Sequence, residues 1–208
     1  MTFETWTIFV PAAFAMTMFP GPNNVQALTN GARHGFSTAV MAASGRFPAF
    51  ALFVLGAAVG LGALLATSAE LFNLLKIIGA GYLVWLGVQM FRSGTLVPGQ
   101  LAADGALWVL VRREFLTAIT NPKGMLVFSA FFAPFVSLSE PAFGQILTLG
   151  TVTLGLEFVT VLIYAYGGSH VGRLTRSPRG LAIVNRVSGS ALIAAGVALL
   201  FARQPAQA

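Results

Sequence analysis

Two long stretches of this chain contain no charged side chain, and this feature restricts the possible folds more than any other. They cover residues 5–32 and 47–69. At 1.5 Å per helical residue, each is long enough for a helix to cross a hydrocarbon layer about 30 Å thick. Only 9% of the 208 residues are charged, against about 25% in soluble globular domains. The sequence therefore predicts an all-α membrane protein.

Four further apolar stretches complete the pattern, and we expect about six transmembrane helices. Two of these stretches contain polar residues, which membrane helices tolerate where the residues face protein or line a cavity. The expected spans cover approximately residues 4–31, 38–66, 70–92, 115–137, 142–169 and 186–203.

A polar segment rich in glycine and proline, residues 94–113, divides the chain into two halves, residues 1–93 and 114–208. Each half holds three expected spans, so the second half enters the membrane from the opposite side, as an inverted repeat requires. We expect two inverted three-helix repeats joined by a cytoplasmic linker, with the first and fourth helices broken.

The basic residues predict an orientation in a bacterial-type inner membrane. If the spans alternate, one side has only Lys76 and Arg203. Because basic loop residues accumulate on the cytoplasmic side, both termini are expected outside the cytoplasm. No basic residue precedes the first apolar stretch, so we expect a spanning helix there rather than a cleaved signal peptide. The basic residues of the opposite side are Arg33, Arg92, Arg112, Arg113, Arg173, Arg176, Arg179 and Arg186.

Composition and motifs exclude several classes of function. The net charge of +6 comes mainly from these loop arginines, so nucleic-acid binding is not expected. The chain has no cysteine, which excludes thiolate metal sites and a membrane thiol redox carrier. No hydrolase, metalloprotease or phosphate-loop motif is present. We predict no enzyme, no cofactor and no metal site.

A proline-rich element interrupts the first span. Pro20, Gly21 and Pro22 cannot continue a regular helix, and Asn23 and Asn24 follow directly. A break frees backbone carbonyls and amides, which the two asparagine side chains can satisfy. Two interpretations remain open: a structural kink, and a kink that also contacts a transported solute.

A second element, Asn121-Pro122-Lys123, interrupts the fourth span at a matching position of the other half. Interrupted helices at corresponding positions indicate the central site of a transporter. Lys123 lies either in that site or near the cytoplasmic end of its helix, with its ammonium group among the lipid headgroups.

Two charged residues lie inside expected spans. Arg46 lies inside the second span, a few helical turns from its start. Because arginine cannot lose its charge, it needs an acidic partner or water there. Glu157, near the middle of the fifth span, is the obvious candidate. The pair either holds a zwitterionic solute or exchanges protons, or it is a structural ion pair.

Four segments together resemble one known family. They are PGPNNVQALTNGARHGF, LLKIIGAGYLVWLGVQMFRSG, FLTAITNPKGMLVFSAFFAPFV and NRVSGSALIAAGVALLF. Over nearly its whole length the chain resembles the lysine exporter (LysE) family, including its homoserine and threonine efflux branch. The resemblance implies a small inner-membrane exporter of amino acids or their derivatives, driven by ion gradients and often working as a homo-oligomer. The family's central elements correspond to Gly21, Pro22, Asn23 and Asn24, and to Asn121, Pro122 and Lys123.

The chain departs from the family pattern at Arg46-Phe47-Pro48, where small, apolar or weakly acidic residues are typical. A fixed cation attracts a carboxylate and repels a dibasic solute. We therefore expect a secondary active exporter of a neutral amino acid or a carboxylate-bearing metabolite, with proton antiport through Glu157. The alternatives are a non-transporting membrane scaffold or assembly protein, and a cation or metal efflux permease.

Overall fold

The computed structural model describes residues 1–65, 105–120, 131–137 and 139–170, with isolated residues between 74 and 92 and between 186 and 197. In these parts every assigned element is helical and no strand occurs, in agreement with the predicted all-α class. The third and sixth expected spans lie outside the continuously described residues. The arrangement of six spans as two inverted repeats therefore stays a prediction.

The first expected span consists of two helices. Helix α1 (Phe3–Met18) starts after Thr2, whose hydroxyl accepts a hydrogen bond from the backbone N–H of Thr5. Helix α2 (Pro22–His34) has Pro22 in its first turn. Proline is tolerated there because backbone N–H groups of the first turn have no carbonyl partner within the helix. The chain is thus interrupted at the position where the two prolines predict a break.

The second expected span also contains an irregularity. Helix α3 (Phe36–Ala43) is followed by α4 (Arg46–Leu65) after the two residues Ser44 and Gly45. Farther along the chain, α8 (Ala142–His170) is a single uninterrupted helix. Among the described residues, the segments Phe36–Gly60 and Ala142–His170 are long and apolar enough to cross a membrane.

Helix α6 (Leu107–Ile119) begins inside the range expected to be a linker, residues 94–113. The prediction placed Arg112 and Arg113 at the end of the polar linker that separates the third and fourth spans. In the structure, Leu110, Glu114 and Ala118 recur every four residues and form the buried face of the helix. Arg112 lies on the exposed side of this helix rather than in a loop.

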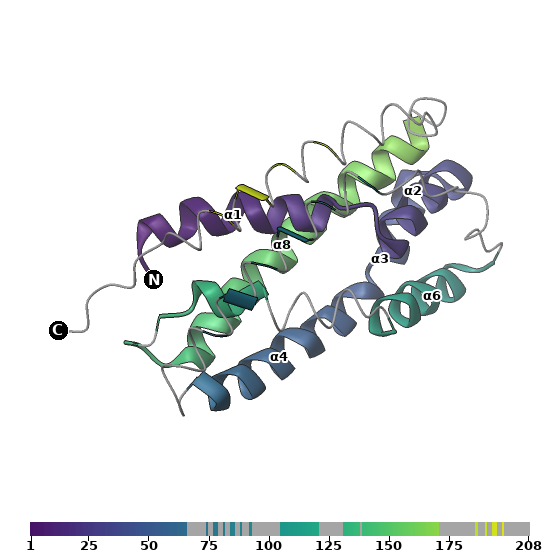
Figure 1. The fold of residues 1–208 in the computed structure, drawn as a ribbon. Helices are drawn as coiled ribbons and strands as arrows, with labels where there is room; N and C mark the ends of the chain where they lie inside the picture. Colours follow the sequence, from purple (N-terminus) through teal and green to yellow (C-terminus); the bar gives the residue numbers. More distant parts are fainter. Residues whose placement is uncertain are drawn as a thin grey trace.

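Helix α8 is the central element of the described fold. It runs along the length of the molecule and packs against α1, α2, α3 and α4 (Figure 1). Helix α6 does not lie in this group: it packs against α4, α3 and α2 near the end of α8 where α2 is found. Residues from both predicted halves of the chain therefore meet around α2.

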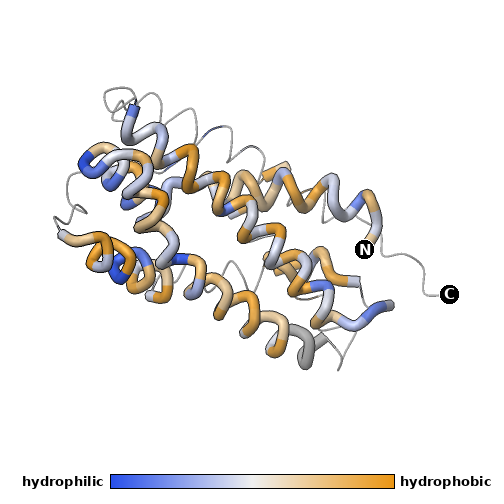
Figure 2. Tube along the Cα trace, turned by 180° about the vertical axis from the view of Figure 1, so that it is seen from behind, coloured by the Kyte–Doolittle hydropathy of each residue, from blue (hydrophilic) through white to orange (hydrophobic). Residues whose placement is uncertain are grey.

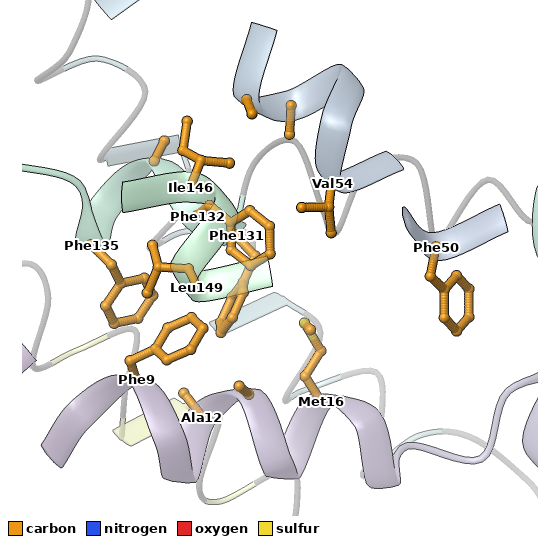
Figure 3. Packing of buried hydrophobic residues seen from close by; sticks show 14 of the residues in the cluster. Phe9, Ala12, Met16, Phe50, Val54, Phe131, Phe132, Phe135, Ile146 and Leu149 are labelled. Atoms are coloured by element: carbon orange, nitrogen blue, oxygen red, sulfur yellow. The ribbon is translucent and has the colours of Figure 1, made fainter. Parts of the chain in front are cut away.

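A cluster of aromatic side chains forms the apolar core at the other end. Phe9 of α1 points toward the short 3-10 helix η2 (Ala133–Phe135) and toward Leu149 of α8 (Figure 3). The ring centroids of Phe9 and Phe135 are 5.0 Å apart, with the rings edge to face. This geometry is the one favoured by aromatic quadrupoles.

The outward faces of the helices are also apolar. Helices α4 and α8 are hydrophobic along most of their length (Figure 2). Such continuous exposed apolar faces are unsuited to water and suited to lipid. Their exposed residues include Leu52, Leu55, Val59, Phe158, Val159 and Ile163.

Two glycines bring α2 and α8 into backbone contact. A Cβ atom at Gly168 would meet the backbone carbonyl of Leu28 and lie 3.0 Å from the backbone nitrogen of Ala32. A Cβ atom at Gly31 would likewise meet the carbonyl of Ala165. The close approach of these helices, which small residues permit, fixes α2 and the helix break that precedes it.

We expect Gly168→Ala to lower the free energy of unfolding by about 1–3 kcal/mol, because the new methyl group has only backbone to displace. The midpoint of thermal unfolding of the purified protein in detergent measures this. The matched control is Gly155→Ala in the same helix, where a Cβ meets nothing within 4 Å. Equal melting temperatures for the two variants would contradict the close packing of α2 on α8.

Candidate functional site

A buried cluster of polar and charged side chains lies where α2, α4, α6 and α8 meet. It consists of Asn23 and Asn24 from α2, Arg46 from α4, Glu114 from α6 and Glu157 from α8. We call it the arginine cluster. Arg46 and Glu114 have no exposed surface, and the other three members are also buried.

The guanidinium group of Arg46 is the centre of the cluster and uses all three of its nitrogens. Its Nε and Nη2 both donate to Oε2 of Glu114, at 3.1 and 2.9 Å. Its Nη1 donates to Oε1 of Glu157 at 2.9 Å and to Oδ1 of Asn24 at 3.1 Å. Its Nη2 also donates to the backbone carbonyl of Asn23. Such charge-assisted hydrogen bonds are the stronger kind.

The residue before Arg46 explains how the guanidinium reaches α6. A Cβ atom at Gly45 would meet the backbone carbonyl of Val111 and lie 3.2 Å from the backbone nitrogen of Phe115. Only glycine allows the α3–α4 junction to approach α6 this closely. Arg46 thereby starts α4 directly beside Glu114.

The asparagines of the helix break connect the backbone to these charges. Nδ2 of Asn24 donates to the carbonyls of Thr17 at 2.7 Å and Phe19 at 2.9 Å, which the end of α1 leaves without helical partners. The Asn24 side chain therefore satisfies the break with its nitrogen and binds Arg46 with its oxygen. Gly21 is the N-cap residue of α2, and with Pro22 it shapes the break without adding a polar side chain.

Asn23 connects the break to α6. Its Nδ2 donates to Oε2 of Glu114 at 2.9 Å and to the backbone carbonyl of the same residue at 3.0 Å. One turn later, Nε2 of Gln26 donates to the hydroxyl of Thr117 at 2.7 Å. Two side-chain contacts with the same three-residue spacing thus join α2 and α6.

Helix α8 holds the break from the other side. The hydroxyl of Tyr164 donates to the carbonyl of Met18 at 2.8 Å, and the hydroxyl of Thr160 donates to that of Thr17 at 2.9 Å. Both follow Glu157 at helical spacing, so one face of α8 contacts the charged cluster and the unwound backbone together.

Three buried side-chain oxygens in this region have no hydrogen-bond partner within the described part of the chain. They are Oδ1 of Asn23, Oε1 of Gln26 and Oε1 of Glu114. Buried oxygens are nearly always hydrogen-bonded in proteins, so each such exception calls for an explanation. All three belong to the facing sides of α2 and α6.

The charges of the cluster do not balance when both carboxyl groups are ionised. One guanidinium faces two carboxylates, so one negative charge remains in excess. Moving an ion out of water costs several kcal/mol even after the protein relaxes. The arrangement therefore favours an additional cationic or hydrogen-donating partner. No group of three potential metal-ligating side chains occurs among the residues that the structure describes.

The structure places several of the expected site residues together. Arg46 and Glu157 are in direct contact, as the pairing hypothesis expects, and Asn23 and Asn24 both touch Arg46. Asn121, Pro122 and Lys123 lie outside the described residues.

Glu114 was missed by the sequence analysis, which placed it at the boundary between linker and second repeat. One signal could have revealed it: Leu110 and Ala118 lie four residues away on either side, so Glu114 lies on the apolar face of any helix through this segment.

Comparisons with known proteins agree with the sequence resemblance. Residues 14–203 match the family model described as LysE type translocator. The chain is 29% identical to the homoserine/homoserine lactone efflux protein of Salmonella typhimurium (strain LT2), over 98% of this chain and 99% of the relative. It is 32% identical to the leucine efflux protein of Enterobacter sp. (strain 638), over 85% of each chain.

A third relative, from Vibrio cholerae serotype O1, is named "uncharacterized membrane protein" and is 30% identical over 98% of this chain and 100% of its own length. No solved structure matches the chain significantly. Because the family model covers residues 14–203 of the 208, the chain belongs to the LysE-type translocator family and is a membrane protein.

Proposed function

We propose that this protein is a secondary active exporter of amino acids or related small metabolites and that the arginine cluster is its central site. The observation that carries the proposal is the complete burial of Arg46 beside the broken first helix, bound to side chains from α2, α6 and α8. A permanently charged residue at such a place serves transport in many membrane proteins. The names of two relatives, which are efflux proteins, support the same conclusion.

The chemistry of the site favours a zwitterionic solute with an uncharged side chain. Arg46 offers a cation to a carboxylate, and the excess acidic charge suits an ammonium group. A second positive charge on the solute would be repelled by the fixed guanidinium at low dielectric. Leucine and homoserine, named for the relatives, both have this neutral zwitterionic form.

The closed cluster also suggests how solute binding is linked to opening. Separating Arg46 from its carboxylates without replacing them costs about 3–5 kcal/mol, because it leaves a buried charge unpaired. A solute carboxylate on Arg46 and a solute ammonium on the acidic partners would compensate this cost. Alternating access then requires one group of helices to move against the other around the broken helix.

We further propose that proton entry drives export across the inner membrane. One elementary charge moving down a membrane potential yields about 2.3 kcal/mol per 100 mV, to which a pH gradient adds. A carboxyl group of the cluster would exchange the proton, and Glu157, near the middle of its span, is the carboxyl group that the sequence favours for this role.

The first test is efflux from bacterial cells loaded with dipeptides, with released amino acids identified by mass spectrometry. We expect cells that produce this protein to release leucine or homoserine several-fold faster than vector controls, and lysine at the control rate. A protonophore should abolish the difference. Release of lysine that depends on the protein, or efflux that persists under the protonophore, would contradict the substrate class or the coupling respectively.

A second test separates transport from mere packing at the cluster. Arg46→Gln leaves two carboxylates without their cation and is expected to destabilise the protein by about 3–5 kcal/mol. The triple variant Arg46→Gln, Glu114→Gln, Glu157→Gln removes all three charges, and we expect it to fold and to lose export at least tenfold. Arg112→Gln, on the exposed side of α6, is the matched control. Wild-type export by a folded triple variant would support a purely structural cluster, as in a membrane scaffold.

The orientation has its own test. If the basic loops are cytoplasmic, Ala208 lies outside the cytoplasm. A reporter fused after Ala208 should then be active only if it is of a kind that functions outside the cytoplasm. Alkaline phosphatase, which needs an oxidising compartment, is expected to be active in this fusion, and green fluorescent protein is expected to stay dark. The opposite pair of results would overturn the predicted topology.

A further inference from the structure

The three unpaired oxygens between α2 and α6 need a common explanation. The side chains of Asn23 and Glu114 are joined by one hydrogen bond, from Nδ2 of Asn23 to Oε2 of Glu114. Yet each has a further side-chain oxygen, Oδ1 and Oε1 respectively, that is buried without a donor among the described residues. Gln26 lies one turn along the same face of α2, and with its Nε2 donating to the hydroxyl of Thr117 its Oε1 has no donor among the described residues. All three side chains are at least 95% buried, with exposures of 5%, 0% and 2% for Asn23, Glu114 and Gln26.

The orientation of the Asn23 amide is fixed by its neighbours. Its Nδ2 donates both to the carboxyl and to the backbone carbonyl of Glu114. If the amide were turned round, its oxygen would face two acceptors, which would repel it. Oδ1 of Asn23 is therefore a hydrogen-bond acceptor, and no described residue donates to it.

One proton would supply the donor for two of these oxygens. A carboxylic acid and a primary amide form two complementary hydrogen bonds, one from the amide N–H to the acid carbonyl and one from the acid O–H to the amide oxygen. The first is present between Asn23 and Glu114. A hydrogen on Oε1 of Glu114 provides the donor for the second, and it also removes the excess negative charge of the arginine cluster.

A primary ammonium group would supply all three. It has three donors and a positive charge, and the site has three acceptors and one negative charge in excess. The proton and the ammonium group therefore compete for two of these oxygens, Oδ1 of Asn23 and Oε1 of Glu114, and the presence of one excludes the other.

We propose that the side-chain oxygens of Asn23, Gln26 and Glu114 form a site that holds either one proton, on Oε1 of Glu114, or the primary ammonium group of the solute. This inference rests on the proposed exporter function and assigns the coupling proton to Glu114 instead of Glu157. The proton comes from water on the outer side and leaves to cytoplasmic water, so that one O–H bond forms and breaks in each cycle. The solute ammonium takes its place for the outward movement, which makes the exchange an antiport.

Among the described residues, the surroundings of Glu114 leave few other titratable groups for this role. Helix α6 packs against α2, α3 and α4. Of these, α3 has no titratable residue, α4 contributes Arg46, and α2 has Arg33 and His34 only at its far end. Within α6 the other titratable residues are Arg112, which is exposed, and Arg113, which is half-buried.

In the described part of the chain, the Glu157 carboxylate is hydrogen-bonded to Arg46, and it differs from Glu114 in two ways. Its side chain is 9% exposed, and neither of its oxygens is among the buried atoms without a partner. Glu114 is thus the carboxyl group whose hydrogen bonding a proton would complete.

The direct test is infrared difference spectroscopy of the purified protein in lipid nanodiscs during a pH titration without solute. Beside the bands of the exposed carboxyl groups, we expect one C=O stretching band of a protonated buried carboxyl group that the wild type, Glu157→Gln and the exposed control Glu140→Gln share and that Glu114→Gln lacks. Addition of L-leucine at constant pH should remove the band and release protons to the medium. N-acetyl-L-leucine, which has no primary ammonium group, should do neither.

Two binding measurements complete the test. Competition with one proton predicts that the apparent Kd for L-leucine rises about tenfold for each pH unit below the midpoint of the titration. Gln26→Leu should keep the carboxyl band and weaken L-leucine binding several-fold, which keeps the proposal testable if Glu114→Gln does not fold.

The outcomes separate this inference from the exporter function. A band that survives in Glu114→Gln and disappears in Glu157→Gln would overturn the assignment to Glu114 and leave the exporter proposal intact. L-leucine binding that is independent of pH would overturn the competition. A wild type that shows the band but releases no solute from cells would refute the exporter function and, with it, the coupling role of this proton.

Discussion

The burial of one guanidinium group is the constraint on which the described structure depends. Arg46 cannot lose its charge, so the fold must bring hydrogen-bond acceptors to it from elsewhere in the chain. They come from three other helices: the asparagines that start α2, Glu114 of α6 and Glu157 of α8. Because Glu114 and Glu157 belong to the second predicted half of the chain, the arginine cluster joins residues from both halves at one point.

The helix break and the charge cluster depend on each other. Ending α1 leaves the carbonyl of Thr17 without a helical partner. The Asn24 amide nitrogen donates to it and to the carbonyl of Phe19, which also accepts from the backbone N–H of Gly21. The oxygen of the same amide accepts from Arg46. A movement that draws α1 away from α2 would therefore disturb the guanidinium, and a change of charge at Arg46 would disturb the break. This physical link is what a transporter with a broken helix at its site requires.

The sequence predicted the parts of this site that follow from local chemistry. Two prolines and a glycine cannot continue a helix, and in a charge-poor chain a buried Arg46 leaves few partners besides Glu157. Glu114 could not be recognised in the same way, since its burial depends on where α6 begins and on how Gly45 lets α4 approach it. The second predicted element, Asn121-Pro122-Lys123, lies outside the described residues, so its relation to Arg46 is still a prediction.

The unequal number of charges distinguishes this cluster from an inert ion pair. A structural pair is most stable when its charges match and every polar atom is bonded, because any remainder is costly at low dielectric. Here one guanidinium binds two carboxyl groups, and among the described residues one carboxyl oxygen of α6 and two amide oxygens of α2 lack a donor. Their side chains belong to the facing sides of the two helices. This excess charge and these oxygens without donors mean that a small hydrogen-bond donor that enters the cluster changes the stability of the closed state. The same imbalance that weakens the cluster as a packing device allows it to respond to protons and to the solute.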